Sequence, residues 1–257
     1  MSESPIYMPP KKDSLALDVE ELRQRLGPVK VGLIEQWIRE VNGPLNALLA
    51  QHITSGSTVL DAGCSRGDPD LPALGEAAFF VGSDLDILGL RANTLCHAAV
   101  LTPLGNLPFR SGSFDVVCCK WVAEHLEHPL TDFQECGRVL KPGGVLVLLT
   151  PNAYSFFTAI SRSIPFRLKQ VLKGAMFGVH EEDTFRTWYR ANSVRTLDLL
   201  LLQAGFKQVQ VTLLPGMWTF FIFWAPLARL VRHLELLQMK TLFRGNATYL
   251  LGAWRKA

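Results

Sequence analysis

The segment from Thr58 to Asp68 constrains the fold of this 257-residue chain more than any other. A β-branched, apolar run ends in the acid Asp61, and a turn that contains Gly63 and Gly67 follows it. Such a run is typical of a buried strand in a parallel sheet, and the turn is typical of the loop at its carboxyl end. Glycines let the loop turn sharply and let a ligand approach the backbone. We therefore predict a ligand site at this loop, where Asp61 accepts hydrogen bonds from a cationic group.

A second acid occupies the corresponding place after the next apolar run. Residues 79–84 end in Asp84, about twenty residues beyond the first acid, a spacing at which an acid binds the ribose diol of a nucleotide cofactor. The glycine loop alone is common to many nucleotide-binding folds and to some corners that bind no ligand. The two acids together favour a cofactor that contains a nucleoside.

Apolar strand patterns alternate with helical patterns along the rest of the chain. The alternation predicts a parallel, doubly wound α/β sheet, whose ligands bind beyond the carboxyl ends of the strands. The predicted strands lie near residues 57–61, 78–84, 98–101, 114–119, 144–150, 208–214 and 248–254.

Four further motifs follow the two acids along the chain. They are a turn at residues 106–113, an apolar strand pattern at 114–119, a segment that ends in Pro-Gly-Gly at 138–144, and an apolar run that ends in Thr-Pro-Asn at 145–152. With them the chain resembles the class I S-adenosylmethionine-dependent methyltransferases, in the subgroup of quinone and natural-product methyltransferases. The resemblance covers roughly residues 57–152, with an echo at residues 199–206. It implies a Rossmann-like sheet of seven strands in the order 3-2-1-4-5-7-6, with the last strand antiparallel, N-terminal helices and a helical lid.

The resemblance also implies S-adenosyl-L-methionine as the cofactor. The methionine part would face Asp61 and the glycine loop, the ribose hydroxyls would bind Asp84, and adenine would pack on Leu85. Leu104 and Gly105 would border the other face of adenine, and Cys119 and Lys120 would close the pocket. The predicted cofactor-binding residues are Asp61, Gly63, Cys64, Gly67, Asp84, Leu85, Leu104, Gly105, Cys119 and Lys120.

The chain departs from the family pattern at two positions. Ser65 stands in the loop where the family usually has glycine, and Pro103 stands where an acid often binds the adenine amino group. The first departure alters the loop, and the second removes one hydrogen bond to adenine.

Histidine is the expected general base for a hydroxyl acceptor. Methyl transfer from a sulfonium requires that donor and nucleophile be held in line and that water be excluded. It requires no metal, and no cluster of metal ligands is evident in the sequence. A hydroxyl nucleophile benefits from a base whose pKa lies near working pH. The candidates are His125, just past the fourth strand, and His180; for each, the alternative is a packed or solvated ring.

Three segments follow from these patterns. Residues 1–56 form an arm and helices, one from Ser14 and one from about residue 28 to His52 that bends at Gly43-Pro44. Residues 57–152 form the cofactor-binding core. Residues 153–257 complete the same domain, and insertions at 153–192 and 215–245 form a substrate lid. The second insertion contains a nearly continuous aromatic and apolar run at residues 217–224, too short to span a bilayer.

The charge of the chain is unevenly distributed, which bears on the partners it can bind. The net charge is +3, but residues 57–154 carry −5 and residues 155–257 carry +9. The basic C-terminal part attracts anionic substrates or lipid, or is simply a solvated surface.

Five cysteines without a Cys-x-x-Cys pair argue against disulfides and zinc. The polar N-terminus is unlike a signal peptide. We expect a cytoplasmic protein that binds no nucleic acid, with peripheral membrane contact and homodimerisation left open.

The predicted function is S-adenosylmethionine-dependent methyl transfer to a small, hydrophobic, lipid-like or natural-product acceptor, with O-methylation favoured. One alternative is an oxidoreductase that uses a nicotinamide cofactor, against which the missing Gly-x-Gly-x-x-Gly order argues. The other is a non-catalytic binding or partner protein that retains the fold, since a fold does not determine a function.

Overall fold

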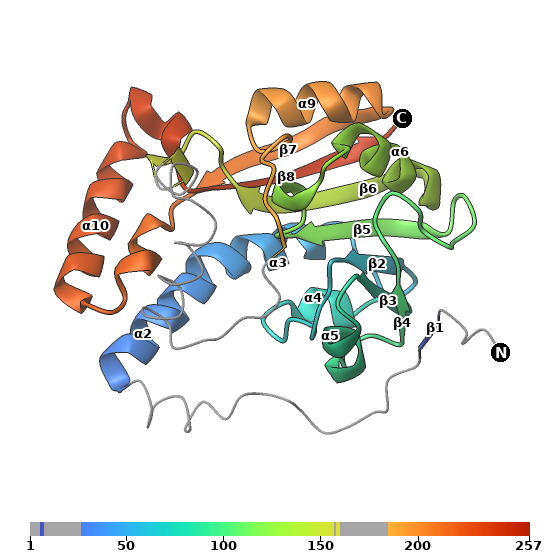
Figure 1. Cartoon of the computed structure of the whole chain (residues 1–257), viewed down its shortest axis with the longest axis horizontal. Coiled ribbons are helices and arrows are strands. Elements are labelled where there is room, and N and C mark those ends of the chain that lie inside the picture. The colour runs from blue at the N-terminus through green and yellow to red at the C-terminus, as the bar shows by residue number, and fades with distance from the viewer. Residues whose placement is uncertain (1–5, 8–26, 157, 160–184) are drawn as a thin grey trace.

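The computed structural model describes residues 6–7, 27–156, 158–159 and 185–257. The described residues form one sheet of eight strands (Figure 1). The strands are β1 (Ile6–Tyr7), β2 (Thr58–Ala62), β3 (Phe79–Asp84), β4 (Ala98–Leu101), β5 (Phe114–Lys120), β6 (Leu140–Pro151), β7 (Phe206–Leu214) and β8 (Tyr249–Lys256).

The strand order is β1-β4-β3-β2-β5-β6-β8-β7. Strands β2 to β6 pair in parallel, whereas β8 pairs antiparallel with both β6 and β7. Apart from β1, this is the predicted seven-stranded order 3-2-1-4-5-7-6, which is therefore confirmed. The sequence analysis missed β1, which pairs antiparallel with β4 through two residues, because two residues show no strand periodicity.

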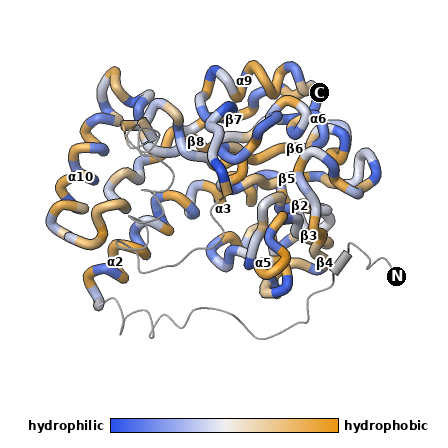
Figure 2. The backbone as a smooth tube through the Cα atoms, in the orientation of Figure 1, coloured by the Kyte–Doolittle hydropathy of each residue, from blue (hydrophilic) through white to orange (hydrophobic). Residues whose placement is uncertain are grey.

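Helices cover both faces of the sheet. On one face lie α3 (Gly43–Ala50), α4 (Pro72–Gly75) and α5 (Ile87–Ala92), and on the other α6 (Pro129–Val139) and α9 (Val194–Gln203). Successive residues of β6 enter opposite cores: Val147 packs with the first group of helices and Leu146 with the second. Because both faces are buried, the central strands are continuous hydrophobic runs, as Figure 2 shows for β6.

The helix predicted to begin after Gly27-Pro28 is present in three parts. Helix α2 (Pro28–Trp37) continues through a π-helical segment, η1 (Ile38–Asn42), into α3. The irregularity thus lies just before Gly43, close to the predicted bend. Proline at position 44 has no N–H to donate to the carbonyl of residue 40, and its ring crowds that carbonyl. The wider π-helical turn at this place accommodates both effects. The helix predicted from Ser14 lies outside the described residues.

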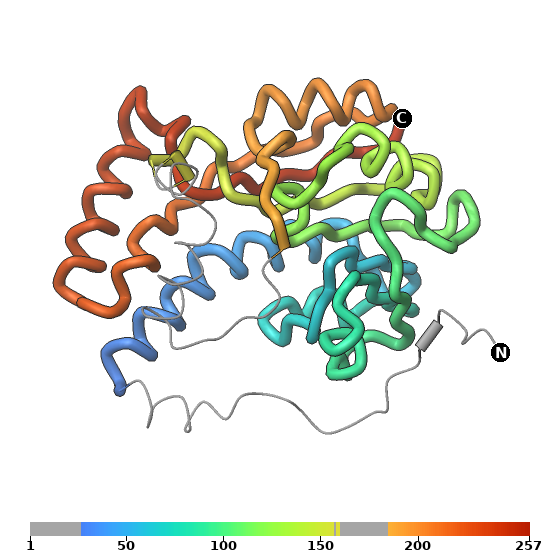
Figure 3. Tube along the Cα trace, viewed as in Figure 1, coloured from blue at the N-terminus to red at the C-terminus, as the bar shows by residue number. Residues whose placement is uncertain are grey.

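Between β7 and β8 the chain leaves the sheet and packs on α2. It forms a 3₁₀ turn, η3 (Met217–Phe221), then α10 (Ala225–Gln238) and a second 3₁₀ turn, η4 (Leu242–Asn246). Figure 3 shows this orange-to-red segment beside the blue α2, at one end of the molecule. Trp218 is fully buried against Leu33 of α2 and Ala228 of α10. Part of the aromatic run is therefore core, whereas Phe223 and Trp224 are exposed.

A single buried carboxylate holds the two ends of this segment. Glu235 of α10 accepts hydrogen bonds from the backbone N–H groups of Gly216 (2.9 Å) and Met217 (2.9 Å), where the segment begins. It also accepts one from the hydroxyl of Thr248 (2.5 Å), where the segment returns to β8. Burial raises the pKa of Glu235, and these donors oppose the rise. None of the helices in the described residues combines the length and apolar character needed to cross a membrane.

We predict that Glu235→Ala destabilises the protein by about 3 kcal/mol, because it leaves buried donors without an acceptor. Urea unfolding measures the change. Glu76→Ala, which removes an exposed glutamate, is the matched control and should change stability by less than about 0.5 kcal/mol. Equal stability of the two variants would contradict the role assigned to Glu235.

Candidate active site

The carboxyl ends of three neighbouring strands bring the predicted site residues together. Asp61 of β2 pairs with Gly82 of β3 on one side and with Cys118 of β5 on the other. Asp84 and Lys120 end those two strands, so they flank Asp61 at the same edge of the sheet. The strands β5 and β6 point toward the side of the molecule where α10 and the start of α2 lie (Figure 1).

The loop after β2 has a backbone conformation that suits glycine. Gly63 and Gly67 both have φ of 84°. The N–H groups of Gly63 and Cys64 donate to the carbonyl oxygen of Ser83 at 2.7 and 3.1 Å, which holds the loop to the end of β3. Ser65 has φ of 40°, so serine occupies the left-handed region at the position where the family usually has glycine. That conformation costs a non-glycine residue about 1–2 kcal/mol.

Asp84 ties the glycine loop to the loop after β3. Its carboxylate accepts hydrogen bonds from the N–H groups of Ser65 (2.8 Å), Leu85 (2.7 Å) and Asp86 (2.9 Å). A carboxylate has about four acceptor positions, so little capacity remains for two ribose hydroxyls unless Ser65 moves. The side chain of Leu85 is 56% exposed, as a surface for adenine would need to be.

Asp61 is buried in acidic surroundings. Burial is the main cause that raises its pKa to about 7, and the charges of Asp68 and Asp84 raise it further, whereas Lys120 lowers it. Lys120 forms an ion pair with Asp68, so its charge is shared. A positively charged ligand group beside Asp61 would relieve this unfavourable concentration of negative charge.

The two predicted cysteines turn their side chains into the core. Cys64 lies against Gly82, and Cys119 contacts Cys136 of α6. Burial raises the pKa of the Cys64 thiol. Only the backbone of these residues is therefore placed to contact a cofactor.

Leu104 and Gly105, which were predicted to border adenine, have the acid Asp132 beside them, and this acid was not predicted from the sequence. Leu104 is partly buried against the core, and Gly105 faces the carboxylate of Asp132, whose Oδ1 lies 2.7 Å from where a Cβ on Gly105 would be. Burial raises the pKa of Asp132 to about 6. Asp132 is thus a carboxyl group close to the place where Pro103 replaces the family's acid.

His125 is half-buried in a 3₁₀ turn, η2 (Ala123–His125), directly after β5. Its Nδ1 lies 3.0 Å from the carbonyl oxygen of Arg186, and Phe185 packs edge-on against its ring. A carbonyl only accepts, so Nδ1 carries the proton, and Nε2 is the acceptor nitrogen of the neutral ring. His180 lies outside the described residues.

Glu124, next to His125, is a buried acid that the sequence analysis missed. Its Oε2 accepts from the hydroxyl of Thr150 (2.9 Å), and Asn192 donates to that hydroxyl (2.6 Å). Burial raises the pKa of Glu124 to about 7. Its position directly after a buried strand was the available signal, but a glutamate is exposed far more often than buried.

Strained backbone marks the same edge. Among the described residues, three that are not glycine have positive φ: Ser65, Trp121 (59°) and Tyr189 (53°). Ser65 follows β2 and Trp121 follows β5, while the N–H of Tyr189 donates to the carbonyl of Glu124. Such conformations cluster at functional sites because the surrounding structure has to enforce them. This edge is therefore the candidate active site of the described chain.

Comparison with known proteins agrees with this geometry. Residues 60–148 match the family described as methyltransferase domain. A probable S-adenosylmethionine-dependent methyltransferase of Mycolicibacterium smegmatis is 37% identical over 114 residues, which are 41% of this chain and 42% of the relative. Residues 60–148 are therefore a methyltransferase domain, similar to S-adenosylmethionine-dependent methyltransferases.

Other similarities extend beyond this methyltransferase domain. A ubiquinone biosynthesis O-methyltransferase of Psychrobacter arcticus is 29% identical over 170 residues, 61% of this chain and 62% of the relative. The chain thus spans about half the length of the curated relatives it matches. A solved S-adenosylmethionine-dependent methyltransferase from Mesorhizobium loti superposes with a TM-score of 0.56 at 21% identity, over 83% of this chain and 96% of that structure. The last similarity shows the shared fold.

The charge at Asp61 predicts that cofactor affinity depends on pH. Because its pKa is about 7, a cationic ligand that binds beside it below that pH must displace a proton. We expect S-adenosylmethionine to bind about tenfold more weakly at about pH 6 than at about pH 8, with proton uptake by the buffer. Titration calorimetry in two buffers of different ionisation enthalpy measures both effects. An Asp61→Asn variant with the same pH dependence would exclude Asp61 as the group responsible.

The contacts of Asp84 predict a second effect on affinity. Asp84→Ala should weaken S-adenosylmethionine binding at least tenfold, because it removes the ribose acceptor and frees the glycine loop. Asp86→Ala is the matched control, since the carboxylate of Asp86 accepts a hydrogen bond from the N–H of Leu88 and caps α5. Calorimetry on folded protein measures both affinities. If the two variants bind equally well, Asp84 is not the cofactor acid.

Proposed function

We propose that this protein transfers a methyl group from S-adenosylmethionine to a hydroxyl of a small, hydrophobic or lipid-like acceptor, with His125 as the general base. The observation that carries the proposal is the position of His125, just past the carboxyl end of β5, the strand that pairs with β2 beside Asp61. The cofactor supplies an electrophilic methyl group on a sulfonium. The protein has to orient the acceptor, exclude water and remove one proton.

The acidic groups at this edge support the cofactor half of this proposal. Burial and two neighbouring carboxylates raise the pKa of Asp61, so a cation beside it would favour its ionised form, and Asp84 ends the neighbouring strand, as expected of an acid that binds ribose. The loop after Asp61 is tied to the end of β3 by hydrogen bonds from its backbone N–H groups to Ser83 and Asp84. These residues therefore fit a ligand that combines a nucleoside with a positive charge.

The groups around His125 support the acceptor half. Nδ1 of His125 is committed to the Arg186 carbonyl, so proton transfer from an acceptor hydroxyl would involve Nε2. Aromatic rings lie along the same edge: Phe185 contacts His125, and Trp121 packs edge-on against Tyr249 with centroids 4.9 Å apart. Aromatic walls with a few polar groups suit an apolar acceptor with one reactive hydroxyl.

Glu124 supports the position of His125 rather than acting on the acceptor. Its buried carboxyl is bonded to Thr150, and its backbone carbonyl accepts from Trp188 (2.7 Å), close to Arg186. Glu124 thus holds the irregular segment that supplies the hydrogen-bond partner of His125. We also propose that residues 153–192 and 215–245 together cover the acceptor, in a cytoplasmic protein.

The alternative function is a non-catalytic protein that binds the cofactor or a partner through the same fold. The left-handed Ser65 and the three hydrogen bonds already accepted by Asp84 favour it. A screen that offers quinol, phenol and lipid hydroxyls and looks for a mass increase of one methylene distinguishes the two. Cofactor binding without any such product supports the alternative.

His125→Ala should lower turnover by ~10²–10⁴ and leave cofactor affinity nearly unchanged, because a general base contributes about that much to rate. Product formation and calorimetry measure the two quantities. His128→Ala, an exposed histidine nearby, is the matched control and should keep full turnover. If His125→Ala remains active with an unchanged pH profile, His125 is scaffold and the proposed mechanism is wrong.

A further inference from the structure

The outer face of α10 carries leucines that no described part of the protein covers. Leu230, Leu234 and Leu237 are about half exposed and lie four and three residues apart, so they form one stripe along the helix. The opposite side of α10, with Ala228 and Glu235, is the buried side. A surface helix normally turns its leucine stripe inward. On α10 the leucine stripe faces outward instead.

The charged side chains exposed beside this stripe in the described residues of the segment are positive. Arg229 immediately precedes Leu230 of the stripe, and Lys240 follows the helix; both are exposed. In residues 215–245, all of which the structure describes, Glu235 is the acid, and it is buried and bonded. Arg232 is paired with Glu40 of η1. The solvent-facing charge of the segment is therefore cationic.

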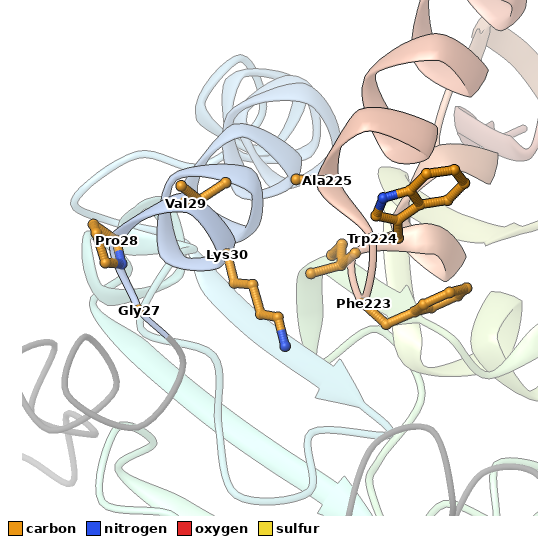
Figure 4. Close-up of a pocket in the computed structure, with 8 residues that line it drawn as sticks. Gly27, Pro28, Val29, Lys30, Phe223, Trp224 and Ala225 are labelled. Carbon is orange, nitrogen blue, oxygen red and sulfur yellow. The ribbon is translucent and has the colours of Figure 1, made fainter.

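Large apolar side chains extend the exposed surface past both ends of α10. Phe223 and Trp224 precede the helix, and Leu242, which is 99% exposed, follows it with Phe243. At the first end, a shallow groove of about 280 Å³ separates residues 222–225 from the start of α2. Figure 4 shows Lys30 of α2 extending beside this groove, near Phe223. Aromatic rings and a lysine thus lie together there.

We propose that the α10 face binds a membrane surface that contains anionic lipid. The α10 face comprises the stripe Leu230, Leu234 and Leu237, the flanking residues Phe223, Trp224, Leu242 and Phe243, and the cations Arg229, Lys240 and Arg244. Interfacial helices combine an apolar stripe with flanking cations and with aromatic residues at their ends. Juxtamembrane cations are attracted to the negative surface of anionic lipids.

Charge and position favour a lipid surface over a protein partner. Among the residues that the structure describes on this face none is an exposed acid, whereas an ordinary protein surface carries mixed charges, and α10 projects at one end of the molecule (Figure 1). It is also held firmly: Arg232 bonds Glu40, and Glu235 bonds both ends of the segment. A membrane contact here would orient the whole domain. The α10 face does not depend on which acceptor the site methylates.

Co-sedimentation of the full chain with vesicles tests the proposal. We expect binding to phosphatidylcholine vesicles that contain phosphatidylglycerol, and at least tenfold weaker binding of the double variant Leu234→Glu, Leu237→Glu. The matched control is Leu199→Glu, Leu202→Glu, which places the same change on two exposed leucines of α9 and should leave binding intact. Arg229→Glu with Lys240→Glu, or added salt, should weaken binding as well. Thermal unfolding checks that each variant folds.

Three results would overturn the proposal. The first is a wild-type chain that does not bind the anionic vesicles. The second is equal binding by the α10 and α9 variants. The third is a wild-type dimer in sedimentation velocity that the α10 variant dissociates without any vesicle binding, which would make the face a contact between two copies. Each outcome is independent of cofactor affinity and turnover, so it leaves the proposed function unchanged.

Discussion

A buried carboxylate at the end of the central strand determines the chemistry of the whole edge. Asp61 lies between two other strand ends, with Asp68 and Asp84 nearby and Lys120 as the cation that lowers its pKa. The parallel pairing of β2 with β3 and β5 forces these groups together, since parallel strands end at one edge. The protein therefore keeps an acid in surroundings that oppose its ionisation. That arrangement is unfavourable for the empty protein and favourable for a cation, which is why the edge suits a sulfonium cofactor.

Asp84 has both a structural contact and an expected role in ligand binding. The same carboxylate that would bind ribose also holds the glycine loop, where Ser65 adopts a conformation unfavourable for serine. The hydrogen bond from Ser65 to Asp84 thus compensates part of the strain in the loop. A ligand that competes with Ser65 for Asp84 would therefore also change the conformation of the loop.

Much of the fold followed from the sequence because the central strands are buried on both faces. Their continuous apolar runs were enough to place seven strands, and the acids that end the first two runs were enough to place the edge where Asp61 and Asp84 meet. The same continuity concealed which way each side chain points, so Cys119 was expected at the pocket although its thiol lies in the core. Glu124 and Asp132 were missed because only tertiary packing buries them. The two residues of β1 were too few to show a pattern.

The contacts of Glu235 make residues 215–248 a closed unit. Leu214 of β7 and Tyr249 of β8 are register partners, so the whole excursion begins and ends at one point of the sheet, as a short hairpin turn would. The entropy of closing a loop grows only slowly with its length, so the antiparallel pair tolerates a long excursion there almost as well as a short one. The pairing of β7 with β8 therefore sets no narrow limit on the length of this segment. A long segment at this point of the sheet thus needs no change in the pairing of β7 with β8.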